Sequence, residues 1–203
     1  KWLCSWAVML SKPSELGYDD NGFILPELKI INHSIPFGKP LPGSLFIQKA
    51  QTLDERRAAR RESIQDKLPV VRELTGNGEQ WLVWCDLNRE SEEVTEAIDA
   101  TEVTGSQPDD EKERRLLGFI NGENRVMVTK SKIAGFGLNM QGCHNVIFFG
   151  LSDSYESFYQ AIRRCWRFGQ KYPVNCHIIT TDIEGNIVEN IKRKETDAIR
   201  MRD

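Results

Sequence analysis

Residues 125–149 of the chain read Arg-Val-Met-Val-Thr-Lys-Ser-Lys-Ile-Ala-Gly-Phe-Gly-Leu-Asn-Met-Gln-Gly-Cys-His-Asn-Val-Ile-Phe-Phe. Two apolar runs, 125–129 and 145–149, flank a turn that contains two glycines and a short helix expected near 137–142. Both runs are too apolar for a sheet with one face in water. Each therefore predicts a strand that is covered on both faces.

The same alternation extends in both directions along the chain. Further strands are expected at 81–85, 101–104 and 174–180. Helices are expected at 91–100 with Ser91 as N-cap, at 109–121, at 155–168, and after Gly185. Strands that alternate with helices predict an α/β fold, in which a mainly parallel sheet lies between two layers of helices.

The first 79 residues have a different composition. Residues 11–44 contain five prolines and four glycines, which predict an extended, turn-rich linker. Apolar residues at helical spacing follow within 45–75, and Pro69 is expected to break this segment into two helices or bend one. The expected domains are a linker over 1–44, a helical connector over 45–79 and an α/β lobe over 80–203. Because residues 1–10 read as a strand without a nearby partner, we expect the natural protein to extend upstream.

The overall composition limits the choice of function. The chain has 203 residues, of which 39% are hydrophobic and 28% are charged, and its net charge is −3. A globular domain is expected, and any nucleic-acid surface must be local. The five cysteines and three histidines are scattered, so reduced thiols, a cytoplasmic location and no metal site are expected. No apolar run approaches the ~18 residues of a membrane span.

Residues 160–170, Gln-Ala-Ile-Arg-Arg-Cys-Trp-Arg-Phe-Gly-Gln, carry the strongest chemical signal. Arg164 and Arg167 are spaced to share one face of the expected helix, with Gln160 one turn earlier. Guanidinium groups are planar, permanently charged donors that suit a triphosphate. A solvated basic helix is the alternative reading of this spacing alone.

This string resembles motif VI of superfamily-two helicases, and most of all the form found in Swi/Snf-type DNA-dependent ATPases. The resemblance implies that Arg167 is the arginine finger, that Arg164 is its catalytic partner on the same nucleotide, and that Gln160 also binds the nucleotide. Two positions depart from the usual pattern: Arg163 replaces a small or acidic residue, and Trp166 replaces a histidine.

Residues 129–139 form the second signal. A strand followed by a turn with Gly135 and Gly137 allows a close approach of the backbone to a phosphate, although a simple tight turn explains the glycines equally well. The string resembles motif V, with Phe136 where a glycine is usual. The resemblance implies two sets of residues. The nucleotide-binding set is Gly135, Gly137 and Asn139, and the DNA-binding set is Thr129, Lys130, Ser131, Lys132 and Ala134.

The resemblance covers residues 80–200 in the expected motif order and implies the RecA-like C-terminal lobe of a helicase or translocase. No P-loop motif and no D-E-x-[HD] box occur in the sequence. ATP and Mg²⁺ are therefore expected to be held mainly by a separate, upstream RecA-like lobe, and this lobe alone is expected to be inactive. The expected partners are DNA and that upstream lobe. A phage or bacterial origin is suspected, with a nuclear location if the source is eukaryotic.

Other readings stay open at this stage. A non-catalytic RecA-like module that binds nucleic acid or protein is the main alternative, and a Rossmann-type enzyme is disfavoured because no G-x-G-x-x-G is present. Trp81 and Trp84 are expected in the core. Two basic segments, the helix after Gly185 and the run Arg56, Arg57, Arg60 and Arg61, are expected to be solvated, with phosphate contact or docking as their alternative roles.

Overall fold

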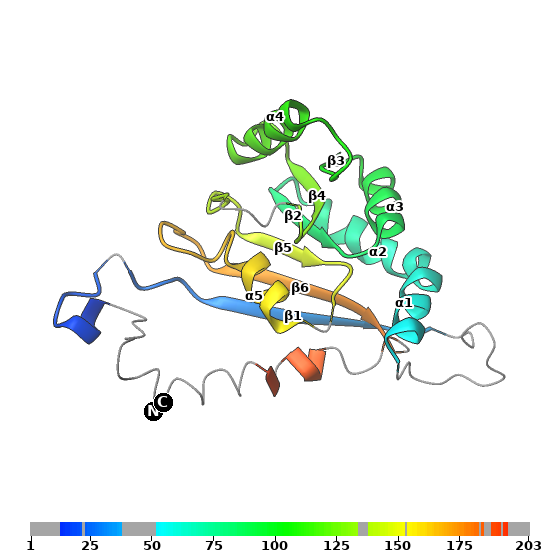
Figure 1. The fold of residues 1–203 in the computed structure, drawn as a ribbon, viewed down its shortest axis with the longest axis horizontal. Helices are drawn as coiled ribbons and strands as arrows, with labels where there is room; N and C mark the ends of the chain where they lie inside the picture. The colour runs from blue at the N-terminus through cyan, green and yellow to red at the C-terminus, as the bar shows by residue number, and fades with distance from the viewer. Residues whose placement is uncertain are drawn as a thin grey trace.

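The computed structural model describes residues 13–21, 23–37, 52–133, 138–152, 154–182, 184, 188–191 and 193–194. Within these ranges, six strands form one sheet in the order β1-β6-β5-β2-β4-β3, and every neighbouring pair is parallel (Figure 1). The strands are β1 (Leu28–Ile35), β2 (Trp81–Cys85), β3 (Thr101–Glu102), β4 (Val126–Lys130), β5 (Asn145–Phe148) and β6 (Val174–Thr181). The helices are η2 (Pro13–Leu16, a short 3-10 helix), α1 (Leu53–Glu62), α2 (Ile64–Thr75), α3 (Asn88–Ile98), α4 (Asp109–Ile120) and α5 (Tyr155–Ile162).

Helices cover both faces of the sheet, as the apolar strands predicted. Successive side chains of a strand point to opposite faces, so β2 divides its residues between two cores. Trp81 and Val83 pack in a cluster with Ile64 and Leu68 of α2 and with α3. Leu82 and Trp84 pack in the other cluster, which includes α5 and α4. The RecA-like three-layer α/β/α fold is therefore confirmed, and both tryptophans lie in the core.

Elements from the first 79 residues contribute to this core. The expected linker contains β1, which pairs with β6 along its full length, from Leu28 opposite Val174 to Ile35 opposite Thr181. The expected connector contains α2, whose buried residues cover one face of the sheet. The division of the chain at residue 80 remains a prediction about domains, but the sheet and its core include residues from both sides of it.

The break between the two N-terminal helices lies earlier than expected. We predicted a break or kink at Pro69, yet α1 ends at Glu62 and α2 begins at Ile64. Pro69 lies inside α2 on its exposed side. The break is at Ser63, because this buried residue turns its hydroxyl towards the Arg60 carbonyl and the Glu184 carboxylate.

Two other expected helices also differ from the structure. Helix α3 begins at Asn88, and Ser91 lies in its first turns instead of at the N-cap. The start is set by the buried Glu90 carboxylate, which accepts hydrogen bonds from the backbone N–H groups of Asp86 and Leu87, each at 2.9 Å. The short helix expected at 137–142 is not formed over residues 138–142, which run without helix into a turn.

The described cysteines are free and buried, as expected: Cys85, Cys143, Cys165 and Cys176. Burial raises the pKa of the Cys85 and Cys176 thiols, which keeps these groups neutral. The fifth, Cys4, lies outside the described residues, as do the strand expected at 1–10 and most of the helix expected after Gly185.

Candidate nucleotide and nucleic-acid interface

Helix α5 and the turns that follow it carry the arginines of the motif VI resemblance. The Ser154 hydroxyl caps α5 by accepting from the Ser157 N–H at 3.2 Å, and Phe158 and Ile162 bury the inner face of the helix. The helix ends at Ile162, several residues earlier than expected. Arg164 and Arg167 therefore lie in the turns after the helix and do not share a helical face.

Tertiary structure nevertheless brings these side chains together. Tyr159, Gln160, Arg163, Arg164, Arg167 and Phe168 line one open hollow of about 390 Å³, which we call the arginine hollow. Gln160 is exposed, and its side-chain amide donates to the Glu156 carboxylate at 3.2 Å. Gly169 has a φ of +90°, a conformation that favours glycine, at the point where the chain turns back towards β6.

The arginine hollow is positively charged. Partial burial lowers the pKa of the Arg164 guanidinium, and the charge of Arg167 lowers it further. Like charges held together in this way favour an anionic ligand, because the ligand would relieve their repulsion.

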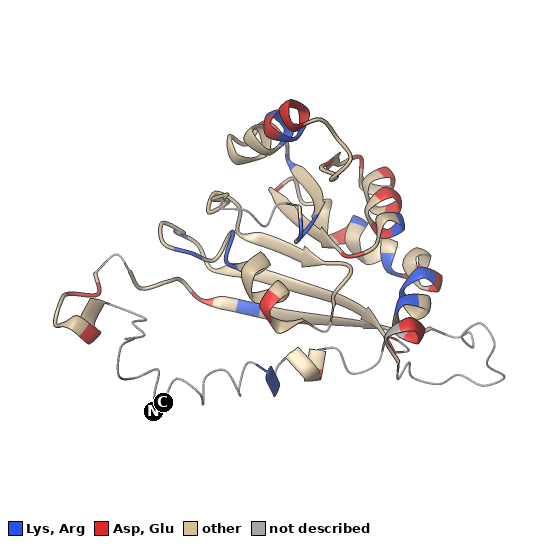
Figure 2. Ribbon diagram, in the orientation of Figure 1, with Lys and Arg blue, Asp and Glu red and all other residues tan. Residues whose placement is uncertain are grey.

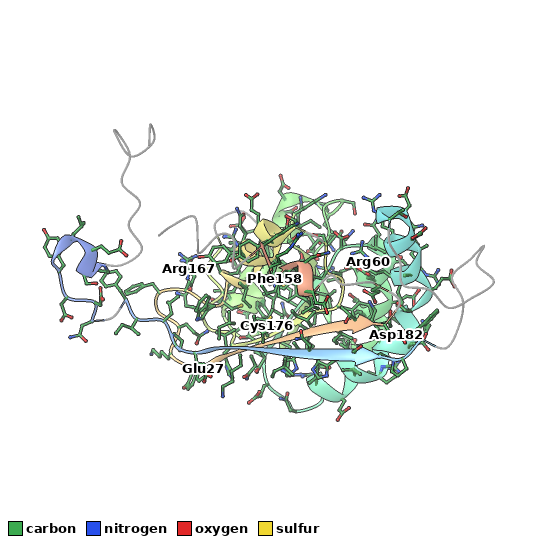
Figure 3. The ribbon with its side chains drawn as sticks, turned by 90° about the horizontal axis from the view of Figure 1, so that it is seen from below. Glu27, Arg60, Phe158, Arg167, Cys176 and Asp182 are labelled. Carbon is green, nitrogen blue, oxygen red and sulfur yellow. The ribbon has the colours of Figure 1, made fainter. Side chains whose placement is uncertain are left out.

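The arginine hollow lies at the edge of the sheet where the strands begin. The Trp166 indole N–H donates to the carbonyl of Pro26, just before β1, at 2.7 Å. The Gln170 amide donates to the carbonyl of Cys143, just before β5, at 3.0 Å. Figure 3 shows Arg167 towards the edge at which Glu27 leads into β1, and Arg60 towards the opposite edge. These two anchoring bonds of Trp166 and Gln170 were not foreseen from the sequence.

The end of the motif V segment reaches the same edge. The backbone N–H of Met140 donates to the carbonyl of Arg164 at 2.9 Å, which places the exposed Asn139 beside the arginine turn. Of the other predicted residues of this segment, Ala134, Gly135 and Gly137 lie outside the described residues.

The DNA-binding residues predicted at the end of β4 lie at the opposite edge of the sheet. Thr129 is fully buried, and its hydroxyl donates to the carbonyl of Val103 at 3.0 Å. Its side chain joins β4 to the chain after β3 and does not reach the surface. The Lys130 ammonium group bonds to Asn88, while Ser131 is half-buried and Lys132 is exposed.

A second open hollow of about 300 Å³ lies beside Lys130. Residues from three elements line it, among them Asn88 and Glu92 of α3, Glu102 of β3, and Thr104, Gly105 and Ser106 after β3. Its charge is mixed, because two carboxylates lie opposite the lysine. In Figure 2 acidic positions predominate on α3 and both signs of charge colour α4, whereas basic positions colour the turn after α5.

The described residues lack any group of three or more His, Cys, Asp or Glu side chains that could hold a metal ion. Within the same ranges, every helix is too short or too polar to cross a bilayer.

The all-parallel sheet between two layers of helices, with an arginine cluster at its amino edge, fits a RecA-like lobe of the superfamily-two helicase type. The sequence pattern of the family described as "Helicase conserved C-terminal domain" matches residues 63–169. The chain belongs to this family.

Curated relatives include both DNA and RNA enzymes. The chain is 30% identical over 97 residues to the human DNA repair and recombination protein RAD54B, which covers 47% of this chain and 10% of that protein. It is 26% identical over 132 residues to the ATP-dependent RNA helicase eIF4A of Yarrowia lipolytica, which covers 63% of this chain and 33% of that protein. The chain thus spans a tenth to a third of the length of these relatives.

Solved structures support the fold. The C-terminal part of the Fun30 ATPase domain matches 62% of this chain and 45% of its own, with a TM-score of 0.54 and 23% identity. A DEAD box protein from the hyperthermophile Methanococcus jannaschii matches 84% of this chain and 40% of its own, with a TM-score of 0.59 and 16% identity.

Proposed function

We propose that this chain is the C-terminal motor lobe of an ATP-dependent DNA helicase or translocase, and that Arg167 and Arg164 act on a nucleotide held mainly by an upstream lobe. The observation that carries the proposal is the arginine hollow itself. It gathers Gln160, Arg164 and Arg167, and none of the described residues that line it carries a carboxylate.

The proposed chemistry is stabilisation of the transferring phosphoryl group. When the lobes close, Arg167 donates to the oxygens of the γ-phosphate. The guanidinium then stabilises the negative charge that these oxygens carry in the transition state. Arg164 holds the same phosphates from the side, and Gln160 lies at the rim. Mg²⁺ and the attacking water belong, in this proposal, to the other lobe, which is why the isolated lobe is expected to be inactive.

The loop after β4 is proposed to contact the DNA backbone through Lys130, Ser131 and Lys132. The described end of this segment lies beside the arginine hollow, because the Met140 N–H donates to the Arg164 carbonyl. DNA is preferred over RNA because of the Swi/Snf-type motif pattern and the similarity to RAD54B.

The test is ATP hydrolysis by the full-length protein that carries this lobe, with and without duplex DNA. We expect DNA-stimulated turnover, and a loss of ~10³-fold or more in Arg167→Ala with ATP binding largely retained. Arg114→Ala is the matched control, since Arg114 pairs with Glu111 on the exposed side of α4. Equal turnover in wild type and Arg167→Ala, or none in wild type, would favour a non-catalytic binding module.

The nucleic-acid contact has its own test. Lys132→Ala should weaken DNA binding across sequences and reduce the slope of log K against log salt by about one. Lys29→Ala is the control, because this exposed lysine lies near the start of β1 and pairs with Glu27. Stimulation by RNA and not by DNA would change the assigned nucleic acid without changing the role of the lobe.

A further inference from the structure

Arg163 is held between two aromatic rings. Its guanidinium carbon lies 5.8 Å from the ring centre of Tyr159 and 5.5 Å from that of Trp166. Tyr159 belongs to α5, whereas Arg163 and Trp166 lie in the turn after its end at Ile162, and this turn brings the guanidinium close to both rings. Such cation–π contacts hold a guanidinium in place while its N–H groups stay available at the edges of the plane.

Both rings of this clamp are themselves anchored. The Tyr159 ring lies 5.9 Å from the ring of Tyr155 on the same helix. The Trp166 indole N–H donates to the carbonyl of Pro26 at 2.7 Å, which fixes it to the chain that leads into β1. Arg163 is therefore pre-positioned, and it would lose little side-chain freedom on binding a ligand.

The described lining of the arginine hollow contains no carboxylate. Arg163, Arg164 and Arg167 line it together with Tyr159, Gln160 and Phe168. Across the described ranges, no Asp or Glu forms an ion pair with Arg163 or with Arg167. Among the described carboxylates, Glu156 contacts a residue of the hollow, because it accepts from the Gln160 amide.

We propose that Arg163 is a third anion-binding residue of the arginine hollow, and that the hollow recognises linked phosphates in preference to a single phosphate. Three guanidinium groups match the charge and the number of oxygens of a diphosphate or triphosphate better than those of one phosphate. The proposal rests on the proposed function in that it deepens the same site. It gives a role to a residue that departs from the two-arginine motif.

The test titrates the 203-residue chain with inorganic triphosphate, pyrophosphate and orthophosphate at constant ionic strength, by calorimetry. We expect wild type to prefer triphosphate and pyrophosphate over orthophosphate. Arg163→Gln should weaken triphosphate binding by about ten-fold and reduce this preference, because it removes one charge-assisted contact. Lys171→Gln is the control: this exposed lysine follows the same turn but does not line the hollow, and it should change binding by less than about two-fold.

Further variants test the aromatic clamp. Tyr159→Ala should weaken triphosphate binding by about three-fold, since the cation–π contact is lost, and Tyr159→Phe, which keeps the ring, should weaken it less. Arg163→Lys should fall between wild type and Arg163→Gln, because the charge remains but the planar fork does not. Circular dichroism of each variant establishes that it is folded.

The outcomes separate this inference from the proposed function. If Arg167→Ala weakens triphosphate binding and Arg163→Gln does not, the role of Arg163 is overturned and the motor proposal stands. If neither variant changes triphosphate binding, the arginine hollow is not a phosphate site. Both the role of Arg163 and the proposed action of Arg164 and Arg167 on the nucleotide are then overturned. Equal affinity for orthophosphate and triphosphate in wild type would overturn the preference for linked phosphates.

Discussion

The ammonium nitrogen of Lys67 lies 3.0 Å from Oε1 of Glu184, and neither side chain is exposed to solvent. Lys67 also donates to the carbonyl of Phe149 at 3.0 Å, and Glu184 accepts from the hydroxyl groups of Ser63 and Thr181. This pair ties α2 to the chain after β5 and β6. A buried ion pair is costly to form, but removing one partner leaves an uncompensated charge.

Lys67→Met should therefore lower the free energy of unfolding of the chain by about 3–5 kcal/mol, because the Glu184 carboxylate would remain buried without its cation. Urea unfolding measures the change. Lys67→Met combined with Glu184→Met should recover much of the loss. Lys29→Met is the control, since its pair with Glu27 is exposed and 3.7 Å long, and it should cost no more than about 1 kcal/mol. If Lys67→Met alone were as stable as wild type, the ion pair would contribute nothing to the free energy of unfolding.

Arg60 and Arg57 should respond very differently to truncation, although both belong to the basic run on α1. Arg60 is only 5% exposed, and its Nη1 donates to the Leu151 carbonyl at 3.0 Å and pairs with Asp86 at 2.9 Å. We expect Arg60→Ala to lower the free energy of unfolding by about 2–4 kcal/mol. The Asp86 carboxylate and the Leu151 carbonyl would both lose the guanidinium that they contact. Arg57 is exposed, and Arg57→Ala should stay within about 0.5 kcal/mol in the same denaturation experiment. Equal losses would contradict the buried role of Arg60.

Gly150 should not tolerate even a methyl group. A Cβ there would lie 2.0 Å from the Glu90 carboxylate and 2.8 Å from the backbone nitrogen of Asp86. Because the carboxylate is itself fixed as the cap of α3, Gly150→Ala should destabilise the fold by about 1–3 kcal/mol. Gly142→Ala is the matched control, since its nearest neighbour would be 4.0 Å away. Thermal unfolding of both variants measures the difference. Equal melting temperatures for Gly150→Ala and Gly142→Ala would contradict this prediction.

The His177 imidazole predicts a dependence of stability on pH. Burial, together with the neighbouring His33, lowers its pKa from 6.5 to about 4. The unfolded chain therefore binds more protons than the folded chain between about pH 6.5 and 4, and stability is lost as the pH falls through this window. The full loss from this group is up to about 3 kcal/mol.

Urea unfolding at pH 7 and pH 4.5 measures this loss, and His177→Gln should reduce it. The His33 Nε2 and His177 Nδ1 atoms lie 2.9 Å apart, across the contact between β1 and β6. An unchanged difference between the two pH values in the variant would assign the acid sensitivity to other groups.

The sequence predicted the architecture well because its strands are short, apolar and separated by amphipathic segments. Strand β2 was placed correctly at both ends, and β4, β5 and β6 within one residue. Composition alone could not show that 28–35 is a strand of the same sheet. This segment becomes a strand of the sheet by pairing with β6, which lies more than a hundred residues further along the chain.

The candidate site was predicted less evenly. The motif order selected Gln160, Arg164 and Arg167, and the structure brings all three to the arginine hollow. The helical reading of their spacing was wrong, because α5 ends at Ile162. The resemblance put Thr129 in the DNA-binding set, whereas the structure buries it and bonds its hydroxyl to the chain after β3. A motif names the residue types of a site, but it does not show which side chains the neighbouring strands cover.

The sequence by itself determined the fold class, the order of the motifs and the identity of the arginines, because apolar periodicity and local spacing are properties of neighbouring residues. Only the tertiary structure decided that Arg60 and Lys67 are buried and that Arg163 joins the arginine hollow. It also placed the two candidate surfaces on opposite edges of the sheet. These features depend on contacts between segments far apart in the chain, and the energy of a charged side chain depends on what surrounds it, not on its position in the sequence.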